Sequence, residues 1–298
     1  MNEHLVKPRS KMPAGPVGAR WVPVSVPETV VAPAQRPRRV SVVNCGIDAL
    51  TFGETLAEVE RLIQARCPAQ HCVVNASKTV LMDKDPRLRE IVSSCALVNA
   101  DGQSLVWASR ILRRPVPERV TGIDLFQALL GLAADRGYGV YFLGATSEIV
   151  EEAVARAGCE HPALRICGWH DGYWDADDDD ELVAHVRASH PDILFVALPS
   201  PRKEYWLAEH LEKLDVPFSM GVGGSFDVYA GRVKRAPLWM QHAGLEWSYR
   251  FWQEPLRLWK RYLLGNLEFV FVVGKHRRPG TAGVAAGGDH PPDGSVAP

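Results

Sequence analysis

The chain repeats one pattern between residues 40 and 223: a short apolar run, often β-branched, is followed by a longer amphipathic stretch. Apolar runs of five to seven residues fit strands that are buried on both faces, and the stretches between them are long enough for helices. Strands that alternate with helices form a mostly parallel sheet, because each crossover helix returns the chain to the same end of the sheet. The sequence therefore predicts an α/β fold with a mostly parallel sheet flanked by helices.

The pattern places seven strands and seven helices. The predicted strands cover residues 40–44, 71–75, 95–100, 139–144, 164–169, 192–198 and 217–223. The predicted helices cover residues 54–66, 86–93, 102–112, 124–136, 147–157, 180–189 and 202–214.

The pattern changes after the last strand, where only helix-like sequence follows. Pro237 and Pro255 are acceptable in the first turns of successive helices. Residues 232–278 contain ten Lys or Arg and three Glu, although the whole chain has a net charge of −1. We therefore expect four parts: a disordered Pro-rich leader (1–39), the α/β core (40–232), an all-helical basic appendage (233–275) and a disordered tail (276–298).

The cysteines and the apolar runs indicate the cellular surroundings. The six cysteines never form a CxxC motif, and several fall in predicted strands, as is typical of reduced core residues. No apolar run is long enough to cross a bilayer as a helix. The N-terminal stretch lacks the apolar segment of a signal peptide. We expect a cytoplasmic protein without disulfides.

Ligands of an open α/β sheet bind beyond the carboxyl ends of the strands, so the residues that follow each strand are the candidates. Asp101 follows the predicted strand 95–100 and begins "DGQSLVWASRIL". Its plain role is to cap the next helix, because aspartate is common at that position. The alternative is a carboxylate at the mouth of the pocket that acts as a general base on a hydroxyl. The residue pattern leaves both roles open.

Two glycine turns at strand ends are candidate ligand contacts. In "GVGGSFD", Gly223 and Gly224 allow the backbone to approach a ligand, and Ser225 can donate a hydrogen bond to a phosphate or a sugar. In "FLGATS", Gly144 ends a strand and is a weaker candidate for a nucleoside contact. Neither turn is a GxGxxG or Walker A motif, so the sequence favours neither a dinucleotide oxidoreductase nor nucleotide hydrolysis.

Acidic pairs and a histidine offer weak matches to metal ligands. Asp83/Asp85 and Asp175/Asp177 have the DxD spacing with which some sugar transferases hold a divalent cation. Each pair lies in a polar loop or at a helix start, and His170 has no second His or Cys at ligand spacing. We interpret all of these as solvated loop and turn residues.

The basic residues of the appendage allow several partners. Arg250, Arg257 and Arg261 are spaced i, i+7 and i+11, which places them on one face of a continuous helix. They could form a solvated face, a nucleic-acid patch, or a site for phosphates or an anionic membrane surface. Nucleic acid is disfavoured, because the rest of the chain has no basic field and no nucleic-acid motif. Neighbouring Trp and Leu residues suit a membrane interface, and the arginines could also neutralise a diphosphate leaving group.

An ordered set of motifs resembles the WecG/TagA/CpsF glycosyltransferase family. The motifs are "VNADGQSLVWASRILRRPVPERVTGIDLF", "YFLGA", "GWHDGYW", "PDILFVALPSPRKEYW" and "GVGGSFDVYAGRVKRAPLWMQHAGLEWSYRFWQEPLRLWKRY", within residues 40–275. The resemblance implies a Rossmann-like core and an inverting transfer, without a metal cofactor, from a UDP-sugar to a polyprenyl-diphosphate-linked sugar. It also implies a peripheral position at the inner face of the plasma membrane, with an arginine-rich appendage that helps to complete the pocket.

The resemblance implies roles for particular residues. Asp101 matches the family's base, which deprotonates the acceptor hydroxyl. Val73 stands where the teichoic-acid members carry threonine, and Lys203 stands where glutamine is usual, so the ligand contacts can differ here. The other residues expected in the acceptor or donor pocket are Asn75, Arg119, Thr121, Gly122, Asp124, Gly144, Pro201, Glu204, Gly223, Gly224 and Ser225. The residues expected to contact diphosphate or membrane are Arg232, Lys234, Arg235, Arg250, Gln253, Arg257 and Arg261.

The leading hypothesis is therefore a UDP-sugar-dependent transferase in cell-surface polysaccharide synthesis, of the N-acetylmannosaminyl or exopolysaccharide type. The expected partners are the UDP-sugar, the lipid-linked acceptor and an anionic membrane surface, and assembly with further copies of the chain stays open. The alternative is a regulatory module without chemistry, which would use the same glycine turns and basic helix to hold a nucleotide or a lipid.

Overall fold

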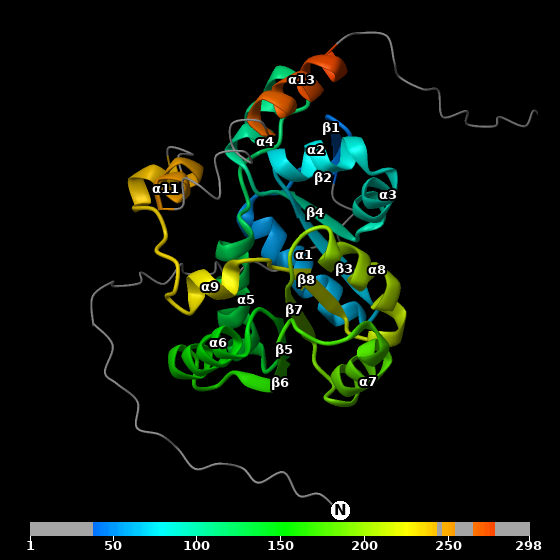
Figure 1. The fold of residues 1–298 in the computed structure, drawn as a ribbon, viewed down its shortest axis with the longest axis vertical. Helices are drawn as coiled ribbons and strands as arrows, with labels where there is room; N and C mark the ends of the chain where they lie inside the picture. Colours follow the sequence, from blue (N-terminus) through cyan, green and yellow to red (C-terminus); the bar gives the residue numbers. More distant parts are fainter. Residues whose placement is uncertain (1–37, 243–245, 254–264, 278–298) are drawn as a thin grey trace, which may run out of the picture.

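The computed structural model describes residues 38–242, 246–253 and 265–277 (Figure 1). Its centre is a six-stranded sheet in which every strand pairing is parallel. The strand order across the sheet is β4-β3-β8-β7-β5-β6. The strands are β3 (Ala69–Val74), β4 (Leu97–Ala100), β5 (Gly139–Gly144), β6 (Arg165–His170), β7 (Ile193–Ala197) and β8 (Phe218–Gly221). The predicted α/β fold with a parallel sheet flanked by helices is confirmed.

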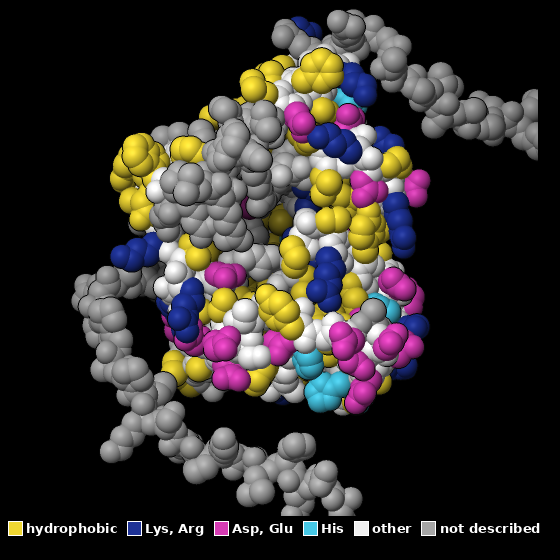
Figure 2. Space-filling view, in the orientation of Figure 1, with side chains coloured by type: hydrophobic (Ala, Val, Ile, Leu, Met, Phe, Trp, Pro, Cys, Tyr) yellow, Lys and Arg dark blue, Asp and Glu magenta, His cyan; other side chains and the backbone are white. Residues whose placement is uncertain are grey.

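Twelve α-helices are described within these ranges. They are α1 (Phe52–Ala65), α2 (Ala76–Lys84), α3 (Pro86–Ser94), α4 (Gln103–Ile111), α5 (Gly122–Arg136), α6 (Ser147–Glu160), α7 (Asp179–Ala188), α8 (Arg202–Leu214), α9 (Ser225–Tyr229), α10 (Leu238–His242), α11 (Glu246–Gln253) and α13 (Gly265–Arg277). A short 3-10 turn at Ala176–Asp178 leads into α7, and its acidic side chains gather on the surface there (Figure 2).

Consecutive residues of each central strand face opposite layers, as the pleat of a strand requires. In β5, Val140 and Phe142 join the core beneath α1, α5, α6 and α9, whereas Tyr141 and Leu143 join the core beneath α7 and α8. Phe126 of α5 lies at the centre of the first layer, with its ring 4.7 Å from that of Phe195 in an edge-on arrangement. Both faces of the sheet are therefore covered.

The first predicted strand, 40–44, is confirmed over residues 40–42, but it ends before Val43 and does not belong to the main sheet. The structure has an antiparallel hairpin there, β1 (Arg39–Val42) and β2 (Cys45–Asp48), separate from the main sheet. The chain reverses at Val43 and Asn44, and Val43 has a φ of 58°, which a β-branched residue seldom adopts. Asn44 is a common turn residue but Val43 is not, so the apolar character of residues 40–43 hides the reversal.

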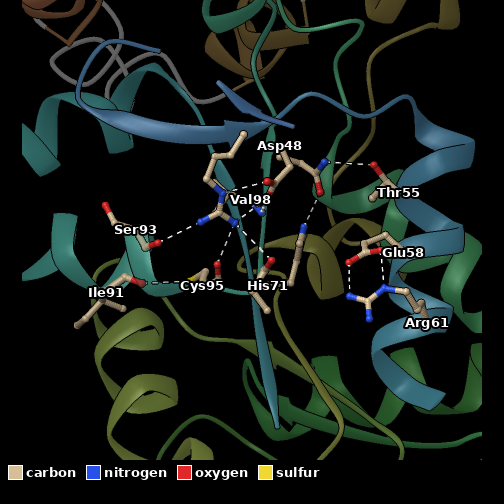
Figure 3. A network of polar contacts seen from close by, with 12 residues as sticks. Asp48, Thr55, Glu58, Arg61, His71, Ile91, Ser93, Cys95 and Val98 are labelled. Atoms are coloured by element: carbon tan, nitrogen blue, oxygen red, sulfur yellow. Dashed lines mark hydrogen bonds and ion pairs between the residues drawn. The ribbon is translucent and has the colours of Figure 1, made fainter. Parts of the chain in front are cut away.

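The hairpin shares a buried apolar cluster with the main sheet, and a buried carboxylate, Asp48, adds polar contacts between them (Figure 3). Its oxygens accept hydrogen bonds from Nε and Nη2 of Arg39, at 2.9 and 2.8 Å, and from the backbone N–H of Val98 at 2.7 Å. Arg39 also donates to the carbonyls of Ser93 and Cys95. The hairpin therefore fixes the connection that leads into β4, the strand that precedes Asp101.

Three helices mark the C-terminal region of the described chain. Pro237 lies directly before α10 rather than within its first turn. Helix α13 packs against α2, and its Glu268 accepts a hydrogen bond from Lys84 at 2.8 Å. Pro255, the predicted leader and the predicted tail after Arg277 lie outside the described residues. No described helix combines the length and the apolar character needed to cross a bilayer.

Candidate functional site

The carboxyl ends of β3 and β4 bring Asn75 and Asp101 together. The two strands are neighbours, and the backbone N–H of Asp101 donates to the carbonyl of Val74 at 2.8 Å. A Cβ placed on Gly102 would lie 3.5 Å from the Cβ of Asn75. Asn75 itself caps α2, because its Oδ1 accepts from the N–H of Lys78 at 3.0 Å.

Asp101 does not cap α4, and the plain role suggested by the sequence is wrong. Gly102 occupies the cap position and makes no side-chain cap hydrogen bond. The Oδ1 of Asp101 instead accepts from the N–H of Gly122 at 3.1 Å, at the first residue of α5. A helix N-terminus stabilises negative charge, so this contact favours the ionised carboxylate. Asp101 is half-buried at the edge of the sheet.

The start of α5 is built by Thr121, Gly122 and Asp124. Thr121 caps the helix by accepting from the N–H of Asp124 at 3.2 Å, and its hydroxyl also contacts that carboxylate. A Cβ built on Gly122 would lie 3.6 Å from a methyl group of Val73, an ordinary packing distance, so α5 begins close to β3. The cap and the close approach together place the N–H of Gly122 beside Asp101.

A chain of four charged side chains connects α5 to the C-terminal helices. Arg235 donates to both carboxylate oxygens of Asp124, at 2.5 and 2.9 Å, and its Nε lies 3.5 Å from Glu246 of α11. Arg119 lies 3.5 Å from the same glutamate and donates to the carbonyl of Gln241 at 3.3 Å. We call Arg119, Asp124, Arg235 and Glu246 the ion-pair chain. It fixes α10 and α11 next to the loop that carries Asp101's partner, Gly122.

The ion-pair chain keeps Asp124 charged. Burial opposes ionisation of this carboxylate, but the hydrogen bonds and charge of Arg235 outweigh burial. The pKa of Asp124 is therefore below its usual range. Arg235 was expected at diphosphate or membrane, and here it lies between two carboxylates and is mostly buried.

Gly144 is required for packing between strands. Its φ is +114°, and a Cβ on it would lie 2.6 Å from the backbone of Ala197 at the end of β7. The next residue, Ala145, donates its N–H to the carbonyl of Ala197 at 3.0 Å. The close contact between β5 and β7 explains this glycine without a ligand.

The "SPRKE" segment forms a buried polar cluster at the start of α8. Glu204 is 1% exposed and accepts from Nζ of Lys78 at 2.7 Å and from Oγ of Ser200 at 2.9 Å. Nζ of Lys203 donates to the same Ser200 hydroxyl at 3.0 Å. The peptide bond between Ser200 and Pro201 is cis. Glu204 and Lys203 thus lie in one cluster, as their shared motif implies. Lys78 belongs to the same cluster, but it was not among the predicted site residues.

Lys78 was not predicted as a site residue because no clear helical pattern marks α2. The helix buries Lys78 and Thr79 beside Val80 and Met82, so its apolar residues do not follow a clear helical period. Nζ of Lys78 also donates to the carbonyl of Val73 at 2.7 Å and contacts Sγ of Cys72 at 3.2 Å. Two lysines and one glutamate therefore share a buried site behind the carboxyl ends of β3 and β8.

The glycine turn after β8 leaves space for Lys203. Cβ atoms on Gly221 and Gly223 would lie 2.9 Å from the Lys203 side chain and 3.4 Å from its Nζ, respectively. Burial and the charge of Lys78 lower the pKa of Lys203. Gly224 caps the five-residue helix α9 without a side-chain bond, and Ser225 donates its hydroxyl to the carbonyl of Val222 at 2.8 Å. The hydroxyl expected to meet a ligand closes the turn in this structure.

The remaining basic candidates differ in their surroundings. Nε of Arg232 donates to Glu152 of α6 at 2.7 Å, and Lys234 is exposed. Arg250 and Gln253 belong to α11, whereas Arg257 and Arg261 lie outside the described residues.

The acidic pairs have structural partners. Asp85 caps α3 and accepts from the hydroxyl of Tyr205, and Asp83 lies 3.7 Å from Lys275. Asp175 and Asp177 flank the start of the 3-10 turn before α7, and Nδ1 of His170 lies 2.9 Å from the carbonyl of Asp171. Among the described side chains, no group of three or more His, Cys, Asp or Glu residues is arranged to hold a metal ion.

Known proteins are similar in sequence to this chain over most of its length. Residues 40–282 match the family described as "Glycosyl transferase WecG/TagA/CpsF family". An N-acetylglucosaminyldiphosphoundecaprenol N-acetyl-beta-D-mannosaminyltransferase of Bacillus spizizenii is 35% identical over 195 residues, 65% of this chain and 74% of that protein. Proteins of the same name are similar in Bacillus subtilis (35% over 180 residues; 60% and 69%) and Staphylococcus aureus (34% over 193 residues; 63% and 73%).

The family match spans the parallel sheet, the residues around Asp101 and the C-terminal helices. Together with the identity to these transferases, the match extends the resemblance from separate motifs to most of the chain. The chain belongs to the WecG/TagA/CpsF family of glycosyltransferases.

Proposed function

We propose that this chain transfers a sugar from a UDP-sugar to N-acetylglucosamine linked to undecaprenyl diphosphate, in the synthesis of a cell-surface polymer. N-acetylmannosamine is the sugar we propose first, because the similar proteins of Bacillus and Staphylococcus are named for it. The observation that carries the proposal is the position of Asp101, held at the edge of the parallel sheet by the N-terminus of α5.

Asp101 acts as the base in this proposal. As the acceptor hydroxyl oxygen attacks the anomeric carbon of the donor, its proton passes to the Asp101 carboxylate. The bond between the anomeric carbon and the diphosphate breaks with inversion, and its electron pair leaves with UDP. The N–H of Gly122 keeps Asp101 oriented and ionised before the transfer, because it donates to the same carboxylate.

Cations replace a metal at the leaving diphosphate in the proposed mechanism. Lys203 is the described candidate, because its amine lies beneath the glycine turn after β8 and shares Glu204 with a second lysine. Glu204 balances the charge of only one of the two lysines, so an anion at this turn would balance the charge of the other. Arg250, Arg257 and Arg261 are the further candidates that the family resemblance assigns to this role.

The C-terminal helices are proposed to complete the pocket as an appendage at the inner face of the plasma membrane. The ion-pair chain supports this arrangement, since it ties α11 to α5 next to Asp101. The lipid-linked acceptor explains why a protein without a described spanning helix would work at that surface.

The test is transfer by Asp101→Asn, with Asp180→Asn as the matched control. The side chain of Asp180 is 82% exposed on α7, away from the strand ends that carry the proposed site. Loss of a general base lowers turnover by roughly 10²–10⁴-fold. We expect this loss for Asp101→Asn only, with an unchanged thermal midpoint and unchanged UDP affinity. Near-normal turnover by a folded Asp101→Asn variant would contradict the assignment.

A further inference from the structure

Helices α4 and α13 expose large apolar side chains to solvent. On α4, Trp107 is 51% and Ile111 is 53% exposed. On α13, Leu267, Val270 and Phe271 are 65–76% exposed. Single exposed apolar side chains are normal on proteins, but two helices with several each indicate a surface that meets a partner. We call these five side chains the α4–α13 face.

The opposite faces of both helices are already used for packing. Leu105 and Ala108 of α4 and Phe269 and Val273 of α13 belong to one buried cluster. Both helices lie at the same end of the molecule (Figure 1), and Figure 2 shows apolar, basic and acidic side chains together over α13. The exposed residues are therefore additional to the core and are not needed to hold the helices in place.

The charged side chains on and directly after α4 are all positive. Arg110 lies three positions after Trp107, on the same face of the helix, and Arg113 and Arg114 follow directly after the helix. All three arginines are exposed, and the sequence between Gly102 and Pro117 contains no Asp or Glu. Trp and Ile beside arginines without acidic neighbours suit an anionic lipid surface, where rings lie at the headgroups and arginines meet phosphates.

The sequence position of α4 relates this surface to the candidate base. Trp107 lies four residues after Gln103, the first residue of α4, which is about 6 Å along a helix with a rise of 1.5 Å per residue. Asp101 directly precedes the cap residue of the same helix, so a bilayer that meets Trp107 would lie close to Asp101. A second copy of the chain is the less suitable occupant, because a two-fold contact would bring the same arginines together.

We propose that the α4–α13 face docks the protein on a bilayer that contains anionic phospholipid. Trp107, Ile111 and the α13 side chains enter the headgroup region, and Arg110, Arg113 and Arg114 bind lipid phosphates. The proposal deepens the proposed function, which supplies the reason for docking, but docking itself requires neither donor nor acceptor.

The experiment measures sedimentation of the full-length protein with vesicles, in the absence of any sugar substrate. The vesicles are phosphatidylcholine alone or phosphatidylcholine with phosphatidylglycerol. The variants are Trp107→Ser/Ile111→Ser on α4, Leu267→Ser/Phe271→Ser on α13 and Arg110→Gln/Arg113→Gln. Tyr173→Ser is the matched control, because Tyr173 is 76% exposed but lies beyond β6, at the other edge of the sheet. Thermal midpoints confirm that each variant is folded.

The wild type is expected to bind only the vesicles with phosphatidylglycerol. Each apolar double variant should weaken binding by at least tenfold, and the arginine variant by about fivefold for each charge removed. Tyr173→Ser should bind like the wild type. Three results would overturn the proposal: no wild-type binding, variants that bind like the wild type, or a loss of oligomers in Trp107→Ser/Ile111→Ser with unchanged vesicle binding. Failure of transfer with normal docking would instead reject the proposed function alone.

Discussion

Asp101 and Ser225 show how individual hydrogen bonds decide which strand-end residues can meet a ligand. Both follow strands, and both belong to residue types that commonly cap helices. Asp101 binds the first N–H of a distant helix, whereas Ser225 donates to a carbonyl of its own turn. Asp101 can make its contact because α5 begins close to the end of β4. The sequence predicts α5 but not its distance from Asp101.

His71 is a residue whose effect on stability can be predicted from its surroundings. It is 1% exposed, and its Nε2 lies 2.9 Å from Oδ1 of Asn99 (Figure 3). Nδ2 of Asn99 donates to Thr55 at 3.2 Å, which orients the amide so that His71 donates to its oxygen. Burial, opposed by the Asn99 contact and assisted by the charge of Lys78, lowers the pKa of His71 from 6.5 to about 4.

The lowered pKa predicts a loss of stability in acid. The unfolded chain binds a proton on His71 below pH 6.5, but the folded chain does so only below about pH 4. The contribution of His71 is therefore complete above pH 6.5 and is lost progressively as the pH falls toward about 4. The loss amounts to about 3 kcal/mol of unfolding free energy over that interval.

Urea unfolding across this pH interval measures the effect of His71. Comparison of the wild type with His71→Gln removes the contributions of carboxylates such as Asp124, which titrate in both proteins. We expect the free energy of unfolding to fall about 3 kcal/mol less in the variant. Parallel pH profiles would show that His71 does not titrate differently in the folded state.

At the scale of elements, α2 and α8 are joined by the buried pair of Lys78 and Glu204. The charged groups approach to 2.7 Å, and both side chains are at most 5% exposed. Removal of one member of a buried ion pair typically costs about 3–5 kcal/mol, because the other charge stays buried. We expect this loss for Lys78→Met in urea unfolding. Lys203, at 3.5 Å from Glu204, should reduce the loss toward the lower value.

An exposed pair provides the control for this prediction. Lys213 lies 2.8 Å from Asp180, and both side chains are more than half exposed. Lys213→Met should change the unfolding free energy by less than about 1 kcal/mol. A Lys78→Met variant no less stable than Lys213→Met would contradict the role of the buried pair in joining the two helices.

The elements differ in how well the sequence predicts them. Helix α3 has Asp85 before a proline at its first turn, and α1 has a capping box of Thr51 and Glu54, so local chemistry indicates where each begins. Helix α2 and the turn that leads from β1 into β2 were not predicted, because Lys78 is buried and Val43 forms the turn with a positive φ. In both cases tertiary contacts outweigh the local preference of the residue.

At the scale of the whole molecule, the parallel sheet and the position of Asp101 at its edge could be predicted, but the ion-pair chain could not. Alternation of apolar runs indicates the order of strands and helices, and this order brings residues after β3 and β4 to one edge. No periodic pattern joins Asp124 to Arg235 or Arg119 to Glu246, because these contacts depend on how distant segments fold together. Only the three-dimensional structure shows these ion pairs.

The molecule has its candidate base, ion-pair chain and proposed docking face within or near the segment from β4 to α5. Asp101 precedes α4, Trp107 and Ile111 lie on α4, and Asp124 lies in the first turn of α5. One continuous segment of chain would therefore set the base, the membrane contact and the position of the C-terminal helices. This arrangement accounts for a transferase that brings a nucleotide donor from water to a lipid acceptor.

The most direct measurement is the mass of the lipid product. The purified full-length protein is incubated with N-acetylglucosaminyl-diphosphoundecaprenol and separate UDP-sugars, of which UDP-N-acetylmannosamine is the first. The account predicts that the lipid gains one sugar from a single preferred donor and that one UDP is released for each product formed. An unchanged lipid with every donor, under conditions in which UDP binds, would contradict the account and leave a nucleotide-binding module without chemistry.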